Sequence, residues 1–488
     1  MRRLYLNLPF LRRYLPGLTL AIALAALYFY NLAGVGVLSS DEPRYAAIGI
    51  AMAQSGDFIT PKLWGSPWFE KPPLLYWMTA VGAGVGFGPE VAGRFPVALL
   101  SAGFLLTSFF LLRREFGIQA AAVASVLLAT SAGWLAYSSL CLTDTPLAVF
   151  FSLAIFLSMP LLEPDCPSAK WRFIAIGVCL GLSTLAKGLV PLALFPPWAW
   201  FLRRQWRRWW LTITAAAFVA LPWYIAVYQR NGYTFVQEFF IRHHLERLYS
   251  PSLQHVQPWY YYIPVLLAGL FPWTPALLLL PRHRSGWDVR RRFLLAIVCW
   301  GLFFFSVSLN KLPGYLLPLF PPLFALVGAH YQQVPIVRTN WGILLSCALL
   351  IALIPLLASI IPESLARGRF TWSSLAGFNR TTFFYVVAPF AVVVMARRAW
   401  VAPLLALSVI AGGLYLKSVA FPVLDRDVSA RGLWRELQKR SADICDAGAN
   451  RDWIYGLNFY RGSAIPPCSP NDTRIHIRSV GHARPVLP

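Results

Sequence analysis

Two short runs of charged residues follow the first long apolar stretch of the chain, and their side chains are suited to chemistry at a membrane surface. The run Asp41-Glu42-Pro43-Arg44-Tyr45 supplies two carboxylates, a guanidinium and a phenol, and Glu70-Lys71-Pro72-Pro73 adds a second pair of opposite charges. Charged groups bordering a bilayer are costly unless they are solvated, paired or used for function. The sequence therefore predicts that the activity resides here.

Membrane-spanning helices must position these residues. Of the 488 residues, 57% are hydrophobic and 13% are charged, and the mean hydropathy is +0.56. This composition excludes a soluble fold and indicates an all-α polytopic membrane protein. We expect the first apolar segment to be a retained helix, because it is too long for a cleaved signal peptide.

About thirteen spans follow from apolar length and from the distribution of basic residues. The positive-inside rule places the N-terminus in the cytoplasm, on the evidence of Arg2, Arg3, Arg12 and Arg13. Residues 73–88 are short and broken by glycine, and a crossing there would invert every later basic linker, so we expect a helix at the outer surface. The expected spans lie near residues 18–38, 91–112, 119–138, 145–162, 172–187, 189–202, 209–228, 259–280, 293–309, 313–331, 340–361, 381–396 and 401–418.

This topology gathers most of the acidic residues, and many basic ones, on one outer face. The net charge is +23, and the cytoplasmic arginines account for only part of it. The outer basic residues favour an anionic substrate such as a lipid phosphate. Nucleic acid is disfavoured, because the basic residues are split between two faces without a binding motif. A transporter or flippase for lipid phosphates remains an alternative, although it would carry ionisable groups near the bilayer midplane.

Several motifs together resemble one family. They are the run from Asp41 to Ala80, Leu142-Thr143-Asp144, Lys187 at a span end, His244-x-x-Arg247, Gln257-Pro258-Trp259-Tyr260-Tyr261-Tyr262 and Lys311-Leu312-Pro313-Gly314-Tyr315. Their order resembles the 4-amino-4-deoxy-arabinose lipid A transferases and the related dolichyl-phosphate-mannose protein mannosyltransferases, over about residues 18 to 424.

The resemblance implies a GT-C glycosyltransferase fold in a bacterial inner membrane. Such an enzyme takes a sugar from a polyprenyl (undecaprenyl) monophosphate donor and inverts the anomeric carbon on the periplasmic side. We expect residues 1–424 to form the catalytic transmembrane domain, with surface helices in the outer loop 39–90. The expected partners are the donor, membrane lipids and an acceptor, either lipid A phosphate or an envelope glycan or protein.

The residues and the resemblance together predict roles. Asp41 is the expected catalytic carboxylate, supported by Glu42 and Asp144, because displacement at a sugar needs a base and cations near the departing phosphate. The expected substrate-binding residues are Arg44, Tyr45, Lys71, Lys187, His244, Arg247, Lys311 and Tyr315. Ordinary alternatives exist: Asp41 or Glu42 could cap the helix that Pro43 begins, and lysines at span ends are common. We expect Asp57 to close a turn.

These motifs identify no cofactor, and a divalent metal remains an alternative. His243, His244 and Glu246 could contribute ligands, although their spacing matches no strong zinc motif. The aromatic run from Trp259 to Tyr262 is typical of an interfacial belt.

The C-terminal residues 425–488 change composition sharply and predict a small periplasmic α/β domain. We expect a helix at 428–441, a strand at 453–457 and a second strand near 475–477. Cys445 and Cys468 could form a disulfide in an oxidising compartment. The tail is shorter than expected for the arabinose transferases, which leaves the acceptor open.

Overall fold

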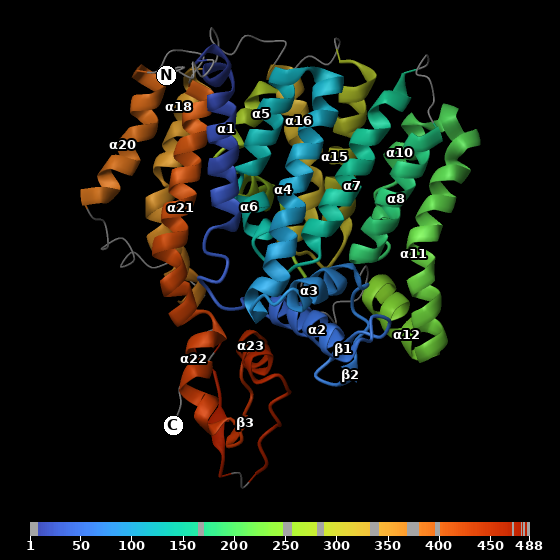
Figure 1. The fold of residues 1–488 in the computed structure, drawn as a ribbon, viewed down its shortest axis with the longest axis vertical. Helices are drawn as coiled ribbons and strands as arrows, with labels where there is room; N and C mark the ends of the chain where they lie inside the picture. Colours follow the sequence, from blue (N-terminus) through green and yellow to red (C-terminus); the bar gives the residue numbers. More distant parts are fainter. Residues whose placement is uncertain are drawn as a thin grey trace, which may run out of the picture.

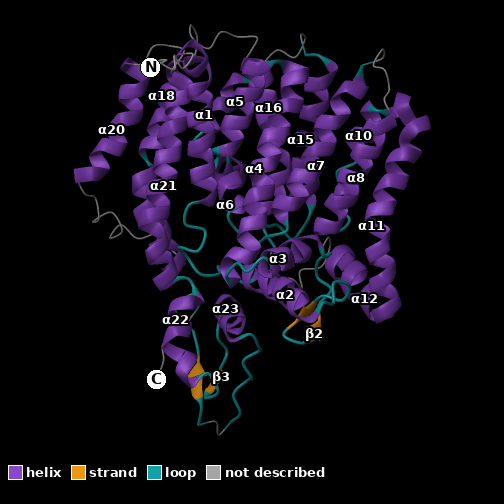
Figure 2. Ribbon diagram, viewed as in Figure 1, coloured by secondary structure: helices purple, strands orange, loops and turns teal. Residues whose placement is uncertain are grey.

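The protein is a bundle of long helices with a small domain attached at one end (Figure 1). The computed structural model describes residues 8–163, 170–246, 256–280, 287–331, 341–367, 380–395, 401–470, 473–479, 481 and 484–485. Among the described residues, strands form two short pairs, one in the outer loop and one inside the small domain (Figure 2). The predicted helical membrane fold is therefore confirmed.

Long helices form the body of the bundle. They are α1 (Leu8–Phe29), α4 (Pro89–Phe116), α7 (Asp144–Ser158), α8 (Lys170–Lys187), α11 (Trp209–Asn231), α15 (Val289–Val307), α16 (Phe320–Tyr331), α20 (Arg380–Met395) and α21 (Val401–Asp427). Within the described ranges, four continuous helices are long and apolar enough to cross a membrane, or six if two bent pairs each count as one span. The number thirteen stays a prediction.

Several predicted spans are broken rather than straight. The predicted span at 119–138 is α5 (Ile118–Ala129) and α6 (Ala132–Ser138), bent by 64°, and the span at 340–361 is α18 (Trp341–Ala352) and α19 (Ile354–Arg367), bent by 47°. Prolines interrupt three others, because proline lacks the N–H group that a continuous helix needs. Those segments contain α9 (Val190–Ala193) with α10 (Pro196–Phe201), η5 (Trp259–Tyr261) with α14 (Tyr262–Gly269) and η6 (Thr274–Leu279), and η7 (Pro313–Leu319) before α16.

The first predicted span, 18–38, is wrong at its C-terminal end. Helix α1 stops at Phe29, and residues 30–40 form a connector that leads to α2 (Asp41–Ser55). Asn31 and Ser39 in this connector have positive φ angles, which a continuing helix does not allow. The connector therefore lies at the end of the bundle rather than inside it.

The outer loop forms two helices and a hairpin below the bundle. Helices α2 and α3 (Leu74–Gly84) lie across the helix ends, and β1 (Lys62–Leu63) pairs antiparallel with β2 (Ser66–Pro67) (Figure 1). A helix of 11 residues is about 16 Å long, too short to cross the bilayer. The short helix predicted at 73–88 is thus present as α3, and its location at the outer membrane surface stays a prediction. On the other side of the loop lie α12 (Tyr233–Val236) and the π-helix η3 (Gln237–Leu245).

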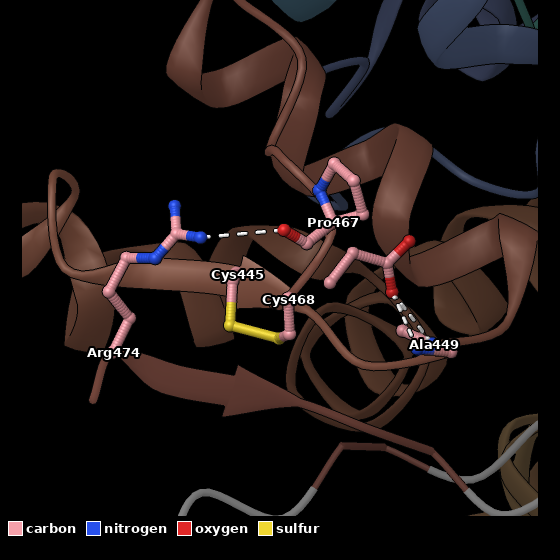
Figure 3. The surroundings of a disulfide bond; sticks show 7 residues. Cys445, Ala449, Pro467, Cys468 and Arg474 are labelled. Carbon is pink, nitrogen blue, oxygen red and sulfur yellow. Dashed lines mark hydrogen bonds between the residues drawn. A yellow bond between two sulfur atoms is a disulfide. The ribbon is translucent and has the colours of Figure 1, made fainter. Parts of the chain in front are cut away.

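The C-terminal domain has its own hydrophobic core. It contains α22 (Ala430–Leu437), η10 (Gln438–Arg440), β3 (Ile444–Asp446), α23 (Arg451–Arg461) and β4 (Ile475–Ile477), with β3 parallel to β4. Figure 3 shows the predicted disulfide between Cys445 and Cys468, which is confirmed.

The predicted strand at 453–457 is wrong, because these residues lie in α23. Asn450 caps this helix by accepting a hydrogen bond from the N–H of Asp452, and Gly462 ends it in the left-handed conformation. Trp453 and Leu457, one turn apart, face the domain core.

Candidate functional site

The first charged run begins α2, and its groups form a chain of ion pairs. The carboxylate of Asp41 pairs with the guanidinium of Arg44, which also donates to Glu70 at 2.7 Å and to the carbonyl of Ser40 at 2.9 Å. Glu70 accepts in turn from Lys71 at 2.9 Å. Side-chain exposure is 36% for Asp41 but only 5% for Arg44, so Asp41 is the member that faces the outside.

Electrostatics keep this chain charged. Burial would raise the pKa of Glu70, but Lys71 and Arg44 outweigh it and hold that pKa well below its usual range. Burial also acts to lower the pKa of Arg44, and Glu70 and Asp41 together raise it instead. Burial, with Asp41 and Glu70 close by, raises the pKa of Tyr45 well above its ordinary value. The phenol of Tyr45 therefore stays protonated and can donate a hydrogen bond.

Aromatic rings surround the guanidinium of Arg44. Its central carbon lies 5.8 Å from the ring centre of Tyr45, 5.5 Å from Trp68 and 5.4 Å from Tyr455. Trp68 follows the β1–β2 hairpin, whereas Tyr455 comes from α23 of the C-terminal domain. The C-terminal domain thus reaches the first charged run.

Glu42 has a different position from the one its predicted catalytic role implies. It is buried, and both of its oxygens accept hydrogen bonds from Arg94 of α4 at 2.7 Å. The same carboxylate also accepts from the backbone N–H groups of Leu38 and Cys141. These four bonds occupy Glu42, so its geometry is that of a structural group. Arg94 was not among the residues singled out from the sequence.

A second pair lies where three elements meet. Asp144 begins α7, and Lys187 at the end of α8 donates to it at 2.5 Å. The ammonium of Lys187 also lies 4.7 Å from the ring centre of Tyr315 in η7. A Cβ on the adjacent Gly314 would collide with the Asp144 carboxylate, so only glycine permits this approach. The structure thus brings together three residues that the sequence predicted for the site.

A cavity of about 190 Å³ lies between the two sets of ion pairs. Its polar lining includes Glu70, Lys71, Lys187, His243 and Tyr315. Its apolar lining includes Leu147, Val190, Ala193, Phe304 and Phe305, from α7, α9 and α15. One end can therefore receive an anion, and the walls can accept a hydrocarbon chain.

Of three further predicted binding residues, the structure describes the side chain of Lys311. The ammonium of Lys311 donates to the carbonyls of Gln257 and Ser308 at 2.9 and 2.5 Å, so it joins two loops instead of lining the cavity. The side chain of His244 and the whole of Arg247 lie outside the described residues. Their roles stay predictions.

The metal hypothesis is likewise untested for His244. Its neighbour His243 lies 3.9 Å from Glu238, and Glu246 is half-buried. Among the described residues, the group with metal-ligand spacing is Cys445, Cys468 and His476, and there the two thiols are joined in the disulfide. Asp57 closes the predicted turn by accepting from the N–H groups of Ile59 and Thr60.

A second cavity, of about 320 Å³, is lined in part by Ser139 and Leu140 of the loop that joins α6 to α7. Its walls are almost entirely apolar and come from α1, α6, α19 and α21. Lys417 reaches it from within α21, and its ammonium donates to the carbonyls of Leu27 and Tyr30 at 2.6 and 3.1 Å. This lysine thereby satisfies the last turn of α1.

Several known proteins are similar to this chain in sequence. Residues 14–235 match the family model of the dolichyl-phosphate-mannose-protein mannosyltransferases. The chain is 32% identical over 333 residues to the undecaprenyl phosphate-alpha-4-amino-4-deoxy-L-arabinose arabinosyl transferase of Pseudomonas aeruginosa (strain UCBPP-PA14). The same identity and length are found for the Edwardsiella ictaluri protein of that name. Each match covers 64% of this chain and 59% of the relative, so the chain matches about three fifths of the relatives' length.

Solved structures extend the likeness to the whole fold. The crystal structure of ArnT from Cupriavidus metallidurans bound to undecaprenyl phosphate superimposes with a TM-score of 0.74 at 22% identity, covering 96% of this chain and 97% of that one. The Archaeoglobus fulgidus oligosaccharyltransferase gives 0.50 at 13% identity, covering 96% and 65%.

Proposed function

We propose that this chain is a glycosyltransferase of the GT-C family, and that it transfers a sugar from a polyprenyl monophosphate donor to an acceptor on the outer side of the membrane. The observation that carries the proposal is the cavity in which Lys71 and Lys187 line the polar end and aliphatic and aromatic side chains line the rest. A phosphate joined to a long hydrocarbon chain has the same two parts.

The two lysines suit the leaving group. When the bond between the anomeric carbon and the phosphate oxygen breaks, negative charge develops on that phosphate. A lysine ammonium has three N–H donors, and Asp144 takes one from Lys187. The remaining donors can bind phosphate oxygens without breaking the pair. Preorganised cations at developing charge are a large source of catalysis.

The carboxylate of Asp41 is the group that contacts the acceptor. It is the exposed member of the ion-pair chain, and Arg44 fixes its orientation. If the acceptor is a hydroxyl group, Asp41 takes its proton as the oxygen attacks from the face opposite the phosphate, which inverts the anomeric carbon. If the acceptor is a phosphate, its oxygen is already ionised, and Asp41 instead holds the groups around it.

We further propose 4-amino-4-deoxy-arabinose as the sugar and a lipid A phosphate as the acceptor. The curated relatives named above carry that sugar and its undecaprenyl phosphate carrier in their names. Two lipids must then meet at one site, and the structure holds two cavities with largely apolar walls. The apolar walls of the larger cavity suit an acyl chain of the acceptor. The corresponding location is the inner membrane, with the site on the periplasmic side.

The test is transfer by the purified protein in detergent. Undecaprenyl phosphate carrying the amino sugar is mixed with lipid A, and mass spectrometry follows the sugar on the acceptor. We expect transfer by the wild type, and a loss of about 10²–10³-fold for Lys187→Met and Asp41→Asn. Lys62→Met is the matched control, because Lys62 lies in the same outer loop as Asp41 but pairs with Asp57 at 3.2 Å.

Separate outcomes would contradict separate parts of the proposal. No transfer by the folded wild type to lipid A, but transfer to an envelope protein, would replace the acceptor. Movement of the lipid phosphate across a vesicle membrane without any transfer would replace the enzyme with a flippase. Equal rates for Lys187→Met and Lys62→Met would show that the cavity does not bind the donor phosphate.

A further inference from the structure

We propose that the C-terminal domain completes the site, with Tyr455 of α23 as a positioning residue that holds Arg44 against Asp41 and Glu70. The activity part of this inference rests on the proposed function. The tyrosine acts through Arg44. Its contribution is the orientation of the catalytic carboxylate.

The contact itself is the first observation. The guanidinium carbon of Arg44 lies 5.4 Å from the ring centre of Tyr455, and the Arg44 side chain is only 5% exposed. Cation–π contacts contribute more when the cation is desolvated. Trp68, at 5.5 Å from the same carbon, lies on the outer loop, so the guanidinium is held between two segments far apart in the sequence.

The hairpin of the outer loop supplies the second observation. Its two-residue turn consists of Trp64 and Gly65, with φ angles of 49° and 91°. Such turns favour Asn-Gly, and a bulky side chain in the left-handed region is strained. The ring of Trp64 packs on Tyr455 with 5.4 Å between centroids. A strained residue persists where surrounding contacts hold it, and here the contact comes from the C-terminal domain.

The third observation is the anchor of the domain. Arg431 of α22 pairs with Asp425 at 2.9 Å and donates to the carbonyl of Ala33 at 2.8 Å. The hydroxyl of Tyr460 accepts from the N–H of Val37 at 3.1 Å. The bonds to Ala33 and Val37 attach the domain to the connector that precedes Asp41. The domain is therefore fixed to the segment whose geometry Tyr455 controls.

A positioning role makes a prediction that a purely structural role does not. Loss of the ring would loosen Arg44 and misplace Asp41, which lowers kcat for each folded molecule. The KM for the donor would stay unchanged, because Lys71 and Lys187 still bind its phosphate. A purely structural role would reduce the yield of folded protein and leave kcat intact.

The experiment compares Tyr455→Leu with Tyr455→Phe in the full-length protein. We expect Tyr455→Leu to lower kcat about 30-fold, the size of a desolvated cation–π contact. Tyr455→Phe keeps the ring and should restore the wild-type kcat. Arg451→Gln is the control, because the exposed Arg451 also approaches the Tyr455 ring, at 5.5 Å, without contacting Asp41 or Glu70 in the described contacts.

A second readout does not depend on catalysis. Hydrogen–deuterium exchange of a peptide covering residues 33–45 should be faster in Tyr455→Leu and unchanged in Tyr455→Phe. Wild-type exchange and wild-type kcat in Tyr455→Leu would overturn the inference, and so would an equal loss of kcat in both variants. If the wild type transfers no sugar, the proposed function fails, and the exchange measurement alone decides this inference.

Discussion

Replacing Arg94 with methionine tests whether Glu42 is structural or catalytic. Arg94 is 1% exposed and makes five hydrogen bonds: two to Glu42 and three to the carbonyls of Leu32, Val35 and Gly36. Methionine removes all of these donors while filling much of the same space. Glu42 would then be a buried carboxylate without a cation, and the connector would lose three contacts.

The loss of unfolding free energy caused by Arg94→Met can be bounded from these contacts. Removing one partner of a buried ion pair costs about 3–5 kcal/mol. Each stranded carbonyl adds up to about 1–3 kcal/mol, but the connector can shift toward water, so we take the ion-pair value as the lower bound. Glu42→Gln leaves Arg94 without its charge partner and should cost a similar amount. The double variant removes both charges, so its loss should be smaller than the sum of the two single losses.

Equilibrium unfolding in detergent, followed by circular dichroism, measures these differences. Specific transfer activity of the folded fraction is measured in parallel. If Glu42 is structural, Glu42→Gln lowers stability while the folded fraction retains substantial activity. If Glu42→Gln keeps wild-type stability and loses transfer, the carboxylate acts on the substrate, and the reasoning from its four hydrogen bonds is refuted.

Three further predictions concern single sites. The pKa of Glu70 is held low because its two cationic neighbours outweigh burial, so its contribution to stability is present above about pH 4.3 and is lost as pH falls. The difference in unfolding free energy between wild type and Glu70→Gln should therefore be constant at about pH 6–8 and shrink in acid. Gly314→Ala should cost about 1–3 kcal/mol and lower transfer, because its Cβ collides with the carboxylate that begins α7, whereas Gly84→Ala, with open space around it, should do neither. Replacing Cys445 and Cys468 with serine opens a 23-residue loop and should cost the C-terminal domain about 3 kcal/mol, seen as faster limited proteolysis of that domain alone.

Much of the site could be predicted from residue types and spacing, but the pairing could not. The sequence placed Asp41, Glu70, Lys71, Asp144 and Lys187 on one outer face, and the structure joins them through ion pairs around one cavity. Hydropathy and charge determine the face on which a loop lies. They do not determine which carboxylate meets which cation, because that depends on how loops fold over the helix ends.

Arg94 shows most clearly which pairings the sequence does not predict. It lies near the outer end of the expected span 91–112, where an arginine that reaches the interface is ordinary. Its role depends on the connector after α1 folding back, and residues 30–40 carry no periodicity that predicts such a path. An available signal was the cost of an arginine inside an apolar segment, which requires partners. Lys417, inside the expected span 401–418, carried the same signal and likewise binds carbonyls of α1 and its connector.

The predictions of straight spans and of a strand at 453–457 failed for different physical reasons. Hydropathy averages over a window and does not detect a bend, so residues 119–138 read as one straight helix. The segment 453–457 is aromatic and β-branched, which favours a strand locally. Its caps lie outside that window, at Asn450 and Gly462, and they together with core packing decide for a helix.

The charge balance of the site supports the proposal that lysines rather than Arg44 bind the donor phosphate. The charges of three carboxylates and three cations cancel, so the site avoids burying net charge, which would be costly. These groups are Asp41, Glu70 and Asp144 with Arg44, Lys71 and Lys187. An arriving phosphate must therefore find donors that are not committed. Arg44 already binds Asp41, Glu70 and a backbone carbonyl, and aromatic rings lie around it. Lys187 shares only one of its three N–H donors with a carboxylate, so it can bind phosphate while Arg44 holds Asp41, the carboxylate proposed to act on the acceptor.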